Sequence, residues 1–205
     1  MNILLVITAF ILAYLLGSVP TAVWAGKIFH GKDLREHGSG NAGAANAIRV
    51  LGWKTGVPVL LIDMAKGWLA AMLPVFFRLA EPETALITNL QIGTGLTAIF
   101  GHILPVFAGF RGGKGVATVS GVILAIHPML TLSCLGVFLI VFLIIRIVSV
   151  ASMIAGVAFP VLLFTLFDTP SLIFRIFAIF IAVALIFTHR NNIKRLLKGE
   201  EKRLF

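Results

Sequence analysis

The sequence predicts an all-α integral membrane protein with seven transmembrane helices, the N-terminus outside and the C-terminus cytoplasmic. Of its 205 residues, 59% are hydrophobic and 12% are charged, whereas about a quarter of the residues in an ordinary soluble domain carry a charge. Several apolar runs approach the roughly 20 residues that a helix needs to cross the hydrocarbon core of a bilayer. The basic residues gather in a few polar segments between these runs, which predicts a sidedness for the chain.

The apolar runs lie at about residues 3–24, 57–77, 86–104, 116–145, 150–167 and 172–188. No Lys or Arg precedes the first run, so we expect it to be retained as a helix and not removed as a signal peptide. The fourth run is too long for one span and contains His127 and Pro128. Because proline removes a helix hydrogen bond and restricts the residue before it, we expect a tight turn there between two shorter helices. This turn brings the expected number of spans to seven.

The distribution of the seventeen Lys and Arg residues supports seven helices, since these residues favour the cytoplasmic side. With seven spans and the N-terminus outside, fourteen of them lie inside and only Arg78 and Arg175 lie outside. With six spans the count becomes eight against eight, and Lys66 lies within a span in both cases. The net charge of +9 is therefore interpreted as a topology signal that also attracts anionic lipid, and nucleic-acid binding is not expected.

A single membrane domain, residues 1–205, is expected, because the sequence contains no soluble linker and no internal repeat. Cys134 is the only cysteine and lies in an apolar run, so it cannot form an intrachain disulfide or a zinc cluster. No metal site and no cofactor are predicted.

Three polar segments fall on the predicted cytoplasmic side, and residues 37–46 form the first. This segment consists almost entirely of small residues, Gly43 among them, and hydrogen-bonding side chains. Successive N–H groups in glycine-rich turns bind anions. Ser39, Asn41 and Arg49 add donors that suit phosphate oxygens. The alternative interpretation is a flexible loop with a patch of small residues for helix packing.

Residues 109–118 form the second segment and run directly into an apolar helix. A helix N-terminus carries N–H groups without intrahelical partners and a partial positive charge, so Gly112, Gly113 and Lys114 are candidates for holding a phosphate. The segment is not a Walker A loop, because Gly115 stands where that motif has a Ser or Thr. The alternative is a basic turn that only anchors the helix.

The third segment is the basic tail that follows the last apolar run. His189 and Asn192 are three positions apart and share one face if the helix continues. Basic tails after a final span are also common topology signals. Ser149 and Ser152 lie in another connection on the same predicted side, where either hydroxyl could cap a helix.

Polar residues also occur inside the predicted spans. Asp63 and Lys66 are three apart in the second run and can pair on one helical face. Charges inside a membrane often mark function, although a lysine near the inner surface that is neutralised by an aspartate fits the pattern equally well. His102 in the third run is interpreted as a helix–helix hydrogen-bonding residue.

Four segments form a recognisable combination: Gly17-Ser18-Val19-Pro20; Gly38-Ser39-Gly40-Asn41-Ala42-Gly43-Ala44 with Asn46; Gly112-Gly113-Lys114-Gly115-Val116-Ala117-Thr118; and His189-Arg190 with Asn192-Ile193, Arg195-Leu196, Gly199 and Glu201. They resemble the motifs of the bacterial acyl-phosphate:glycerol-3-phosphate acyltransferase family. The resemblance spans nearly the whole chain in motif order and spacing, with Ala45 as a departure where the family commonly has threonine.

The resemblance implies transfer of a fatty acyl group from acyl-phosphate to the sn-1 hydroxyl of glycerol 3-phosphate, giving lysophosphatidic acid and phosphate in bacterial phospholipid synthesis. It also implies a multi-pass protein of the bacterial cytoplasmic (inner) membrane that contacts membrane lipid and whose active site faces the cytoplasm. The sequence leaves open whether the protein has protein partners. The residues that match catalytic positions of the family are His189, Ser39 and Lys114. Those that match substrate-binding positions are Asn41, Gly43, Arg49, Gly112, Gly113, Ser152 and Asn192. Either His189 or the substrate's own phosphate is expected to accept the proton of the glycerol hydroxyl.

Another acyltransferase class and a membrane transporter are the two alternatives to this function. Acyltransferases with a His-x-x-x-x-Asp pair are excluded, because none of the five histidines has aspartate at the required position. A small-anion transporter is the remaining alternative, since glycine-rich helix breaks and cations also form transport sites. Such breaks usually lie near the bilayer midplane in repeated halves, whereas here they are predicted at one surface and without a repeat.

Overall fold

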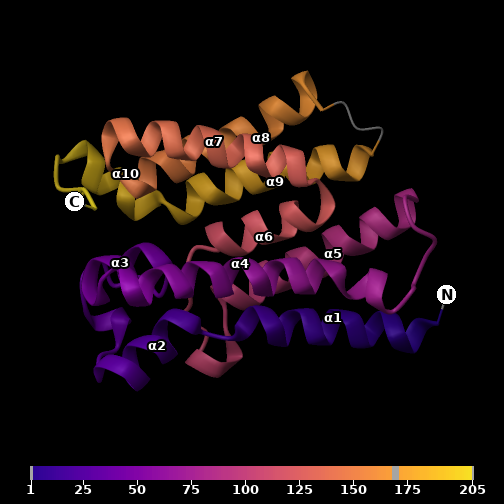
Figure 1. The fold of residues 1–205 in the computed structure, drawn as a ribbon, viewed down its shortest axis with the longest axis horizontal. Coiled ribbons are helices and arrows are strands. Elements are labelled where there is room, and N and C mark those ends of the chain that lie inside the picture. Colours follow the sequence, from indigo (N-terminus) through magenta and orange to yellow (C-terminus); the bar gives the residue numbers. More distant parts are fainter. Residues whose placement is uncertain (1, 168–170, 205) are drawn as a thin grey trace. The chain divides into compact units, whose positions relative to one another are not determined.

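The computed structural model describes residues 2–167 and 171–204, and every regular element within them is a helix (Figure 1). The all-α prediction is therefore confirmed. The chain forms two compact units, Met1–Ile126 and His127–Phe205, and each is described here by itself. The single domain expected for the whole chain stays a prediction.

The described part of the first unit contains eight helical segments: α1 (Ile3–Ser18), α2 (Thr21–His30), the 3₁₀ turn η1 (Leu34–Glu36), α3 (Ala44–Leu51), α4 (Trp53–Phe76), α5 (Ala85–Ile103), the 3₁₀ turn η2 (Val106–Ala108) and α6 (Val116–Ile126). Helix α4 packs against α1, α5 and α6, and α1 also packs against α5. Small residues allow these helices to approach closely. A Cβ atom added at Gly121 of α6 would collide with the Met64 carbonyl of α4.

The first apolar run is not one helix, which corrects the expectation of a single continuous helix over residues 3–24. Helices α1 and α2 meet at a bend of 41°, and Pro20 lies between them. Proline has no N–H group and cannot continue the helical hydrogen bonds. The carbonyl of Val19 instead accepts a hydrogen bond from Nζ of Lys66 on α4 at 2.9 Å. The Gly-Ser-Val-Pro motif thus marks a helix break that a charged side chain stabilises.

The second unit consists of α7 (Pro128–Ile145), α8 (Val148–Thr165), α9 (Leu172–Thr188) and α10 (Arg190–Leu197) in its described residues. The expected break at His127 and Pro128 is confirmed. Nδ1 of His127 accepts the N–H of Leu130 at 3.3 Å, and Pro128 occupies the first turn of α7, where no intrahelical bond is lost. After α9 the chain bends by 54° into α10.

The seven apolar segments that the sequence indicated are all helical in the structure. Within residues 2–167 and 171–204, four helical segments are long and apolar enough to cross a membrane alone, and up to six spans result if each bent pair is one span. Helix α6 has 11 residues and is shorter than a usual span. The count of seven spans and the sides of the two termini therefore stay predictions.

Candidate active site

The ten predicted site residues are divided between the two units. The first unit carries Ser39, Asn41, Gly43, Arg49, Gly112, Gly113 and Lys114, and the second carries Ser152, His189 and Asn192.

Asn46 organises the first polar segment from the inside. It lies in the first turn of α3 and is 1% exposed. Its Nδ2 atom lies 3.0 Å from each of the carbonyl oxygens of Leu34, His37 and Asn41. Its Oδ1 atom accepts the N–H of Ser39 at 2.9 Å. One buried amide therefore fixes the backbone of the whole turn that precedes α3.

The predicted ligands of this segment sit on the turn that Asn46 fixes. Ser39 is exposed, and it lies between Gly38 and Gly40, which both adopt the left-handed conformation with φ of +64° and +72°. A side chain at Gly38 would also collide with the buried amide of Asn46. The glycines are therefore required to present the Ser39 hydroxyl at the surface of this turn.

Arg49 lies on α3 one turn after Asn46. Its Nε atom is buried and has no hydrogen-bond partner within the described residues. A buried N–H group without a partner is costly, and an anionic oxygen would satisfy it with a strong charge-assisted bond. The role of Arg49 as a phosphate ligand stays a prediction, and its buried Nε atom is compatible with it.

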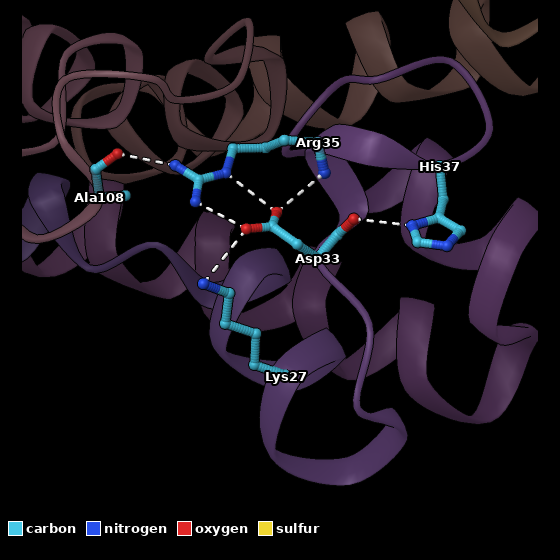
Figure 2. Close-up of polar contacts among 5 residues, drawn as sticks. All are labelled: Lys27, Asp33, Arg35, His37 and Ala108. Carbon is cyan, nitrogen blue, oxygen red and sulfur yellow. Dashed lines mark hydrogen bonds and ion pairs between the residues drawn. The ribbon is translucent and has the colours of Figure 1, made fainter.

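The structure adds an ion pair that the sequence analysis did not single out (Figure 2). The carboxylate of Asp33 accepts hydrogen bonds from the N–H, Nε and Nη2 of Arg35 at 3.0, 2.9 and 2.7 Å, and Nζ of Lys27 lies 3.2 Å away. The hydrogen bonds from Arg35 hold the pKa of the Asp33 carboxyl well below its usual range, although partial burial opposes the shift. Nη1 of Arg35 donates to the carbonyl of Ala108 at 2.8 Å, just before the second polar segment.

The backbone amides of Gly112 and Gly113 have partners within the first unit. The N–H of Gly112 donates to the carbonyl of Ile103 at 3.2 Å, and that of Gly113 donates to the carbonyl of His102 at 3.1 Å. These two N–H groups therefore fasten the loop to the end of α5, and the substrate-binding role expected for Gly112 and Gly113 stays a prediction. The candidates at this helix start are Lys114 and the N–H groups of the first turn of α6.

The first and second polar segments come together at Gly113. A Cβ atom added there would collide with the imidazole of His102 and would lie 3.1 Å from the carbonyl oxygen of Ala42. Glycine at position 113 thus lets the backbones of the two segments lie close together without crowding. The turn that carries Ser39 and the loop that carries Lys114 are thus neighbours in the first unit.

A buried ion pair lies beside this loop. Oδ1 of Asp63 is 2.8 Å from Nζ of Lys66 and accepts a hydrogen bond from the Thr21 hydroxyl at 3.0 Å. Nδ1 of His102 lies 3.8 Å from the same oxygen. These four side chains are less than a tenth exposed. Lys66 also holds the break between α1 and α2, so the ion pair has a clear structural role in addition to its place near the loop.

His189 and Asn192 are buried at the bend between α9 and α10, with exposed fractions of 3% and 6%. Nδ1 of His189 lies 2.7 Å from the carbonyl oxygen of Leu185. A carbonyl can only accept, so Nδ1 carries the proton and Nε2 is the basic nitrogen of the neutral ring. This tautomer is the one that a general base at Nε2 requires.

Glu201, which belongs to the fourth sequence motif but was not among the predicted site residues, hydrogen-bonds to several polar residues of the second unit. Its carboxylate accepts hydrogen bonds from the Ser149 hydroxyl at 2.7 Å, from Asn192 Nδ2 at 2.5 Å and from Arg195 Nε at 2.7 Å. Burial raises the pKa of Glu201, but the hydrogen bonds from Arg195, Asn192 and Ser149 outweigh it and lower the pKa overall. The hydroxyl in this network is that of Ser149, and Ser152 lies buried one turn further along α8.

Comparison with known proteins supplies the family. Residues 7–199 match the glycerol-3-phosphate acyltransferase family. The chain belongs to this family. It is 45% identical to the glycerol-3-phosphate acyltransferase of Chlorobaculum tepidum, over 95% of this chain and 94% of that protein. It is 43% identical to that of Chlorobium phaeobacteroides strain BS1, over 94% of this chain and 93% of that protein.

Solved structures of a relative agree with this assignment. The glycerol 3-phosphate form of PlsY (YgiH), an integral membrane glycerol 3-phosphate acyltransferase, is 40% identical, with a TM-score of 0.84 over 97% of this chain and 94% of that one. Its lysophosphatidic acid form is 38% identical, with a TM-score of 0.81 over the same shares. This chain is therefore an integral membrane acyltransferase, as the sequence motifs predicted.

Proposed function

We propose that this protein transfers a fatty acyl group from acyl-phosphate to the sn-1 hydroxyl of glycerol 3-phosphate, giving lysophosphatidic acid and inorganic phosphate. The observation that carries the proposal is the 40% identity, over 97% of the chain, to an acyltransferase with a glycerol 3-phosphate form. The lysophosphatidic acid form of the same relative supports the product. The acyl-phosphate donor rests on the resemblance of the sequence motifs.

The first unit supplies the phosphate-binding groups in this proposal. Two anionic phosphates must be held while the acyl chain stays in lipid, so the reaction needs cations and hydrogen-bond donors at a polar surface. Arg49, with its buried Nε atom, and Lys114, at the start of α6, are the proposed cations. Ser39 and Asn41 add polar groups on the turn fixed by Asn46.

The chemistry requires positioning more than activation, because acyl-phosphate is already an activated donor. The sn-1 hydroxyl oxygen forms a bond to the acyl carbonyl carbon, and the bond between that carbon and the phosphate oxygen breaks. The phosphate leaves with the bonding electron pair, and a nearby cation stabilises its charge. The hydroxyl proton passes either to Nε2 of His189 or to the phosphate of glycerol 3-phosphate, whose second pKa is about 6.

We also propose that the protein resides in the bacterial cytoplasmic membrane with its polar segments on the cytoplasmic side. Fourteen of its seventeen Lys and Arg residues fall on that side if seven helices span the bilayer. The donor's acyl chain and the acylated product then remain at the lipid surface, while glycerol 3-phosphate arrives from water.

The direct test is product formation by the purified protein in liposomes. Glycerol 3-phosphate is supplied with palmitoyl-phosphate in one reaction and with palmitoyl-CoA in a parallel one. We expect lysophosphatidic acid only with palmitoyl-phosphate. Lys114→Ala should lower kcat/KM by about a hundredfold or more, because it removes a charge that stabilises the leaving phosphate. Lys54→Ala, which removes an exposed lysine at the start of α4, is the matched control and should retain activity.

Three other results of this assay would change the proposal. Product from palmitoyl-CoA alone would contradict the proposed donor. No product from either donor in a folded preparation would refute acyl transfer, and uptake of glycerol 3-phosphate into the same liposomes would then support the transporter alternative. His189→Ala separates the two proton acceptors. A raised KM with an unchanged single-turnover rate would assign the proton to the substrate phosphate and leave His189 a binding role.

A further inference from the structure

The Arg35 side chain hydrogen-bonds to Ala108, which is 73 positions away in the sequence, and so connects the regions directly before the first and second polar segments. Its Nε and Nη2 atoms bind the Asp33 carboxylate, while Nη1 donates to the Ala108 carbonyl (Figure 2). The side chains of Arg35 and Asp33 are only 18% and 14% exposed, whereas that of Lys27 is 53% exposed. A planar guanidinium can bind a carboxylate and a carbonyl at once in a fixed geometry, which a lysine ammonium cannot reproduce.

On one side of this link lies the turn that leads to Ser39. Nδ1 of His37 lies 2.9 Å from the carbonyl oxygen of Asp33, and the Asn46 amide binds the carbonyl of His37. The turn is thus held by its own hydrogen bonds, and the Arg35 side chain beside it donates a hydrogen bond to the Ala108 carbonyl, directly before the second segment.

On the other side lies the loop that leads to Lys114. Ala108 is followed by Gly109 and Phe110, which both adopt positive φ angles of +61° and +59°. The N–H of Phe110 donates to the Pro105 carbonyl at 2.9 Å. The chain therefore leaves Ala108 through a tight, defined turn, so the position of the Ala108 carbonyl influences where the loop begins.

We propose that Arg35, oriented by Asp33, is a positioning residue that holds the turn carrying Ser39 and the loop carrying Lys114 at a fixed separation for binding of a substrate phosphate. This inference rests on the function proposed above, because it assigns both segments to one phosphate-binding surface. Arg35 touches no reacting atom in this account. Asp33 acts only by holding the guanidinium in the plane that reaches Ala108.

The proposal predicts a specific kinetic pattern. Arg35→Lys keeps the positive charge but removes the planar guanidinium that binds Asp33 and Ala108 at once. We expect KM for glycerol 3-phosphate to rise about tenfold, because small misplacements of binding groups are costly. The value of kcat should change much less, because saturating substrate restores the bound geometry. Lys27→Met removes the other cation near Asp33 and is the matched control, with an expected change below about twofold.

Chemical rescue distinguishes positioning from a general folding role. Arg35→Gly should show a larger increase in KM, and millimolar guanidinium should lower it again by occupying the vacated position. The same addition should not affect Arg35→Lys or the wild type. Failure of guanidinium to lower the KM of a folded Arg35→Gly protein, together with a wild-type KM for Arg35→Lys, would overturn the proposal.

An activity-independent measurement keeps the inference separate from the proposed function. Hydrogen–deuterium exchange without substrate should be faster over residues 109–115 in Arg35→Lys and Arg35→Gly, and unchanged in Lys27→Met. Unchanged exchange in both Arg35 variants would overturn the link between the segments. If the wild type makes no lysophosphatidic acid, the proposed function fails, whereas this exchange result still decides whether Arg35 connects the two segments.

Discussion

Asn46→Asp tests whether one buried amide fixes the turn that presents Ser39. The substitution keeps the size of the side chain but replaces the NH₂ group by an oxygen. Three carbonyl oxygens that lie 3.0 Å from Nδ2 in the structure would then face an acceptor. The hydrogen bond from the Ser39 N–H to Oδ1 would remain.

The size of the effect follows from these contacts. Two N–H groups serve the three carbonyls, and each lost hydrogen bond costs about 0.5–1.5 kcal/mol net. Placing a carboxylate among carbonyl oxygens in a site that is 1% exposed adds a further penalty for burying an unpaired polar group, about 1–3 kcal/mol. We therefore expect the turn to lose about 3 kcal/mol, which corresponds to about a hundredfold increase in local opening.

Hydrogen–deuterium exchange over residues 34–41 measures this opening directly. Exchange should accelerate about a hundredfold in Asn46→Asp at neutral pH. It should slow again as the pH falls, because a protonated carboxyl can donate one hydrogen bond to a carbonyl. Wild-type exchange rates at neutral pH, in a protein whose helices are intact by circular dichroism, would refute the role assigned to Asn46.

Three further predictions concern stability. Asp63→Asn should lower the free energy of unfolding in mixed micelles by about 3–5 kcal/mol, because it leaves the Lys66 ammonium buried without a counter-charge. Replacing both Asp63 and Lys66 by apolar residues should recover most of this loss. The pKa of Glu201 is lowered in the folded protein, so its hydrogen bonds contribute their full stabilisation above about pH 4.5, the ordinary pKa of a glutamate. This contribution is lost as the pH falls through the lower folded-state pKa, and the melting temperature of Glu201→Gln should lack this acid dependence. Gly113→Ala adds a methyl group that collides with an imidazole of α5 and should cost about 1–3 kcal/mol in the same unfolding assay, whereas wild-type stability would show that the loop can shift freely.

Local chemistry explains what could be predicted from the sequence. Apolar runs of span length became helices because a chain in lipid must satisfy its backbone internally. The break at Pro128 was predictable because proline constrains its immediate neighbours. The same rule applies at Pro20, although residues 3–24 were interpreted as one continuous apolar run.

Contacts between distant positions explain what could not be predicted. No periodic pattern relates Arg35 to Ala108, and the short spacing between Asp33 and Arg35 is unremarkable in a polar loop. The amides of Gly112 and Gly113 looked available because a helix start usually leaves such groups unpaired. Their partners are carbonyl groups at the end of α5, and only the folded chain brings these within reach.

A double-label experiment tests whether one acyl group passes from acyl-phosphate to glycerol 3-phosphate. The most direct measurement supplies the purified protein in liposomes with palmitoyl-phosphate labelled with ³²P and glycerol 3-phosphate labelled with ¹⁴C. We expect equal molar amounts of ¹⁴C in lysophosphatidic acid and of ³²P in inorganic phosphate. Appearance of ³²P in the lipid product, or release of ³²P without any ¹⁴C-labelled lipid, would contradict it.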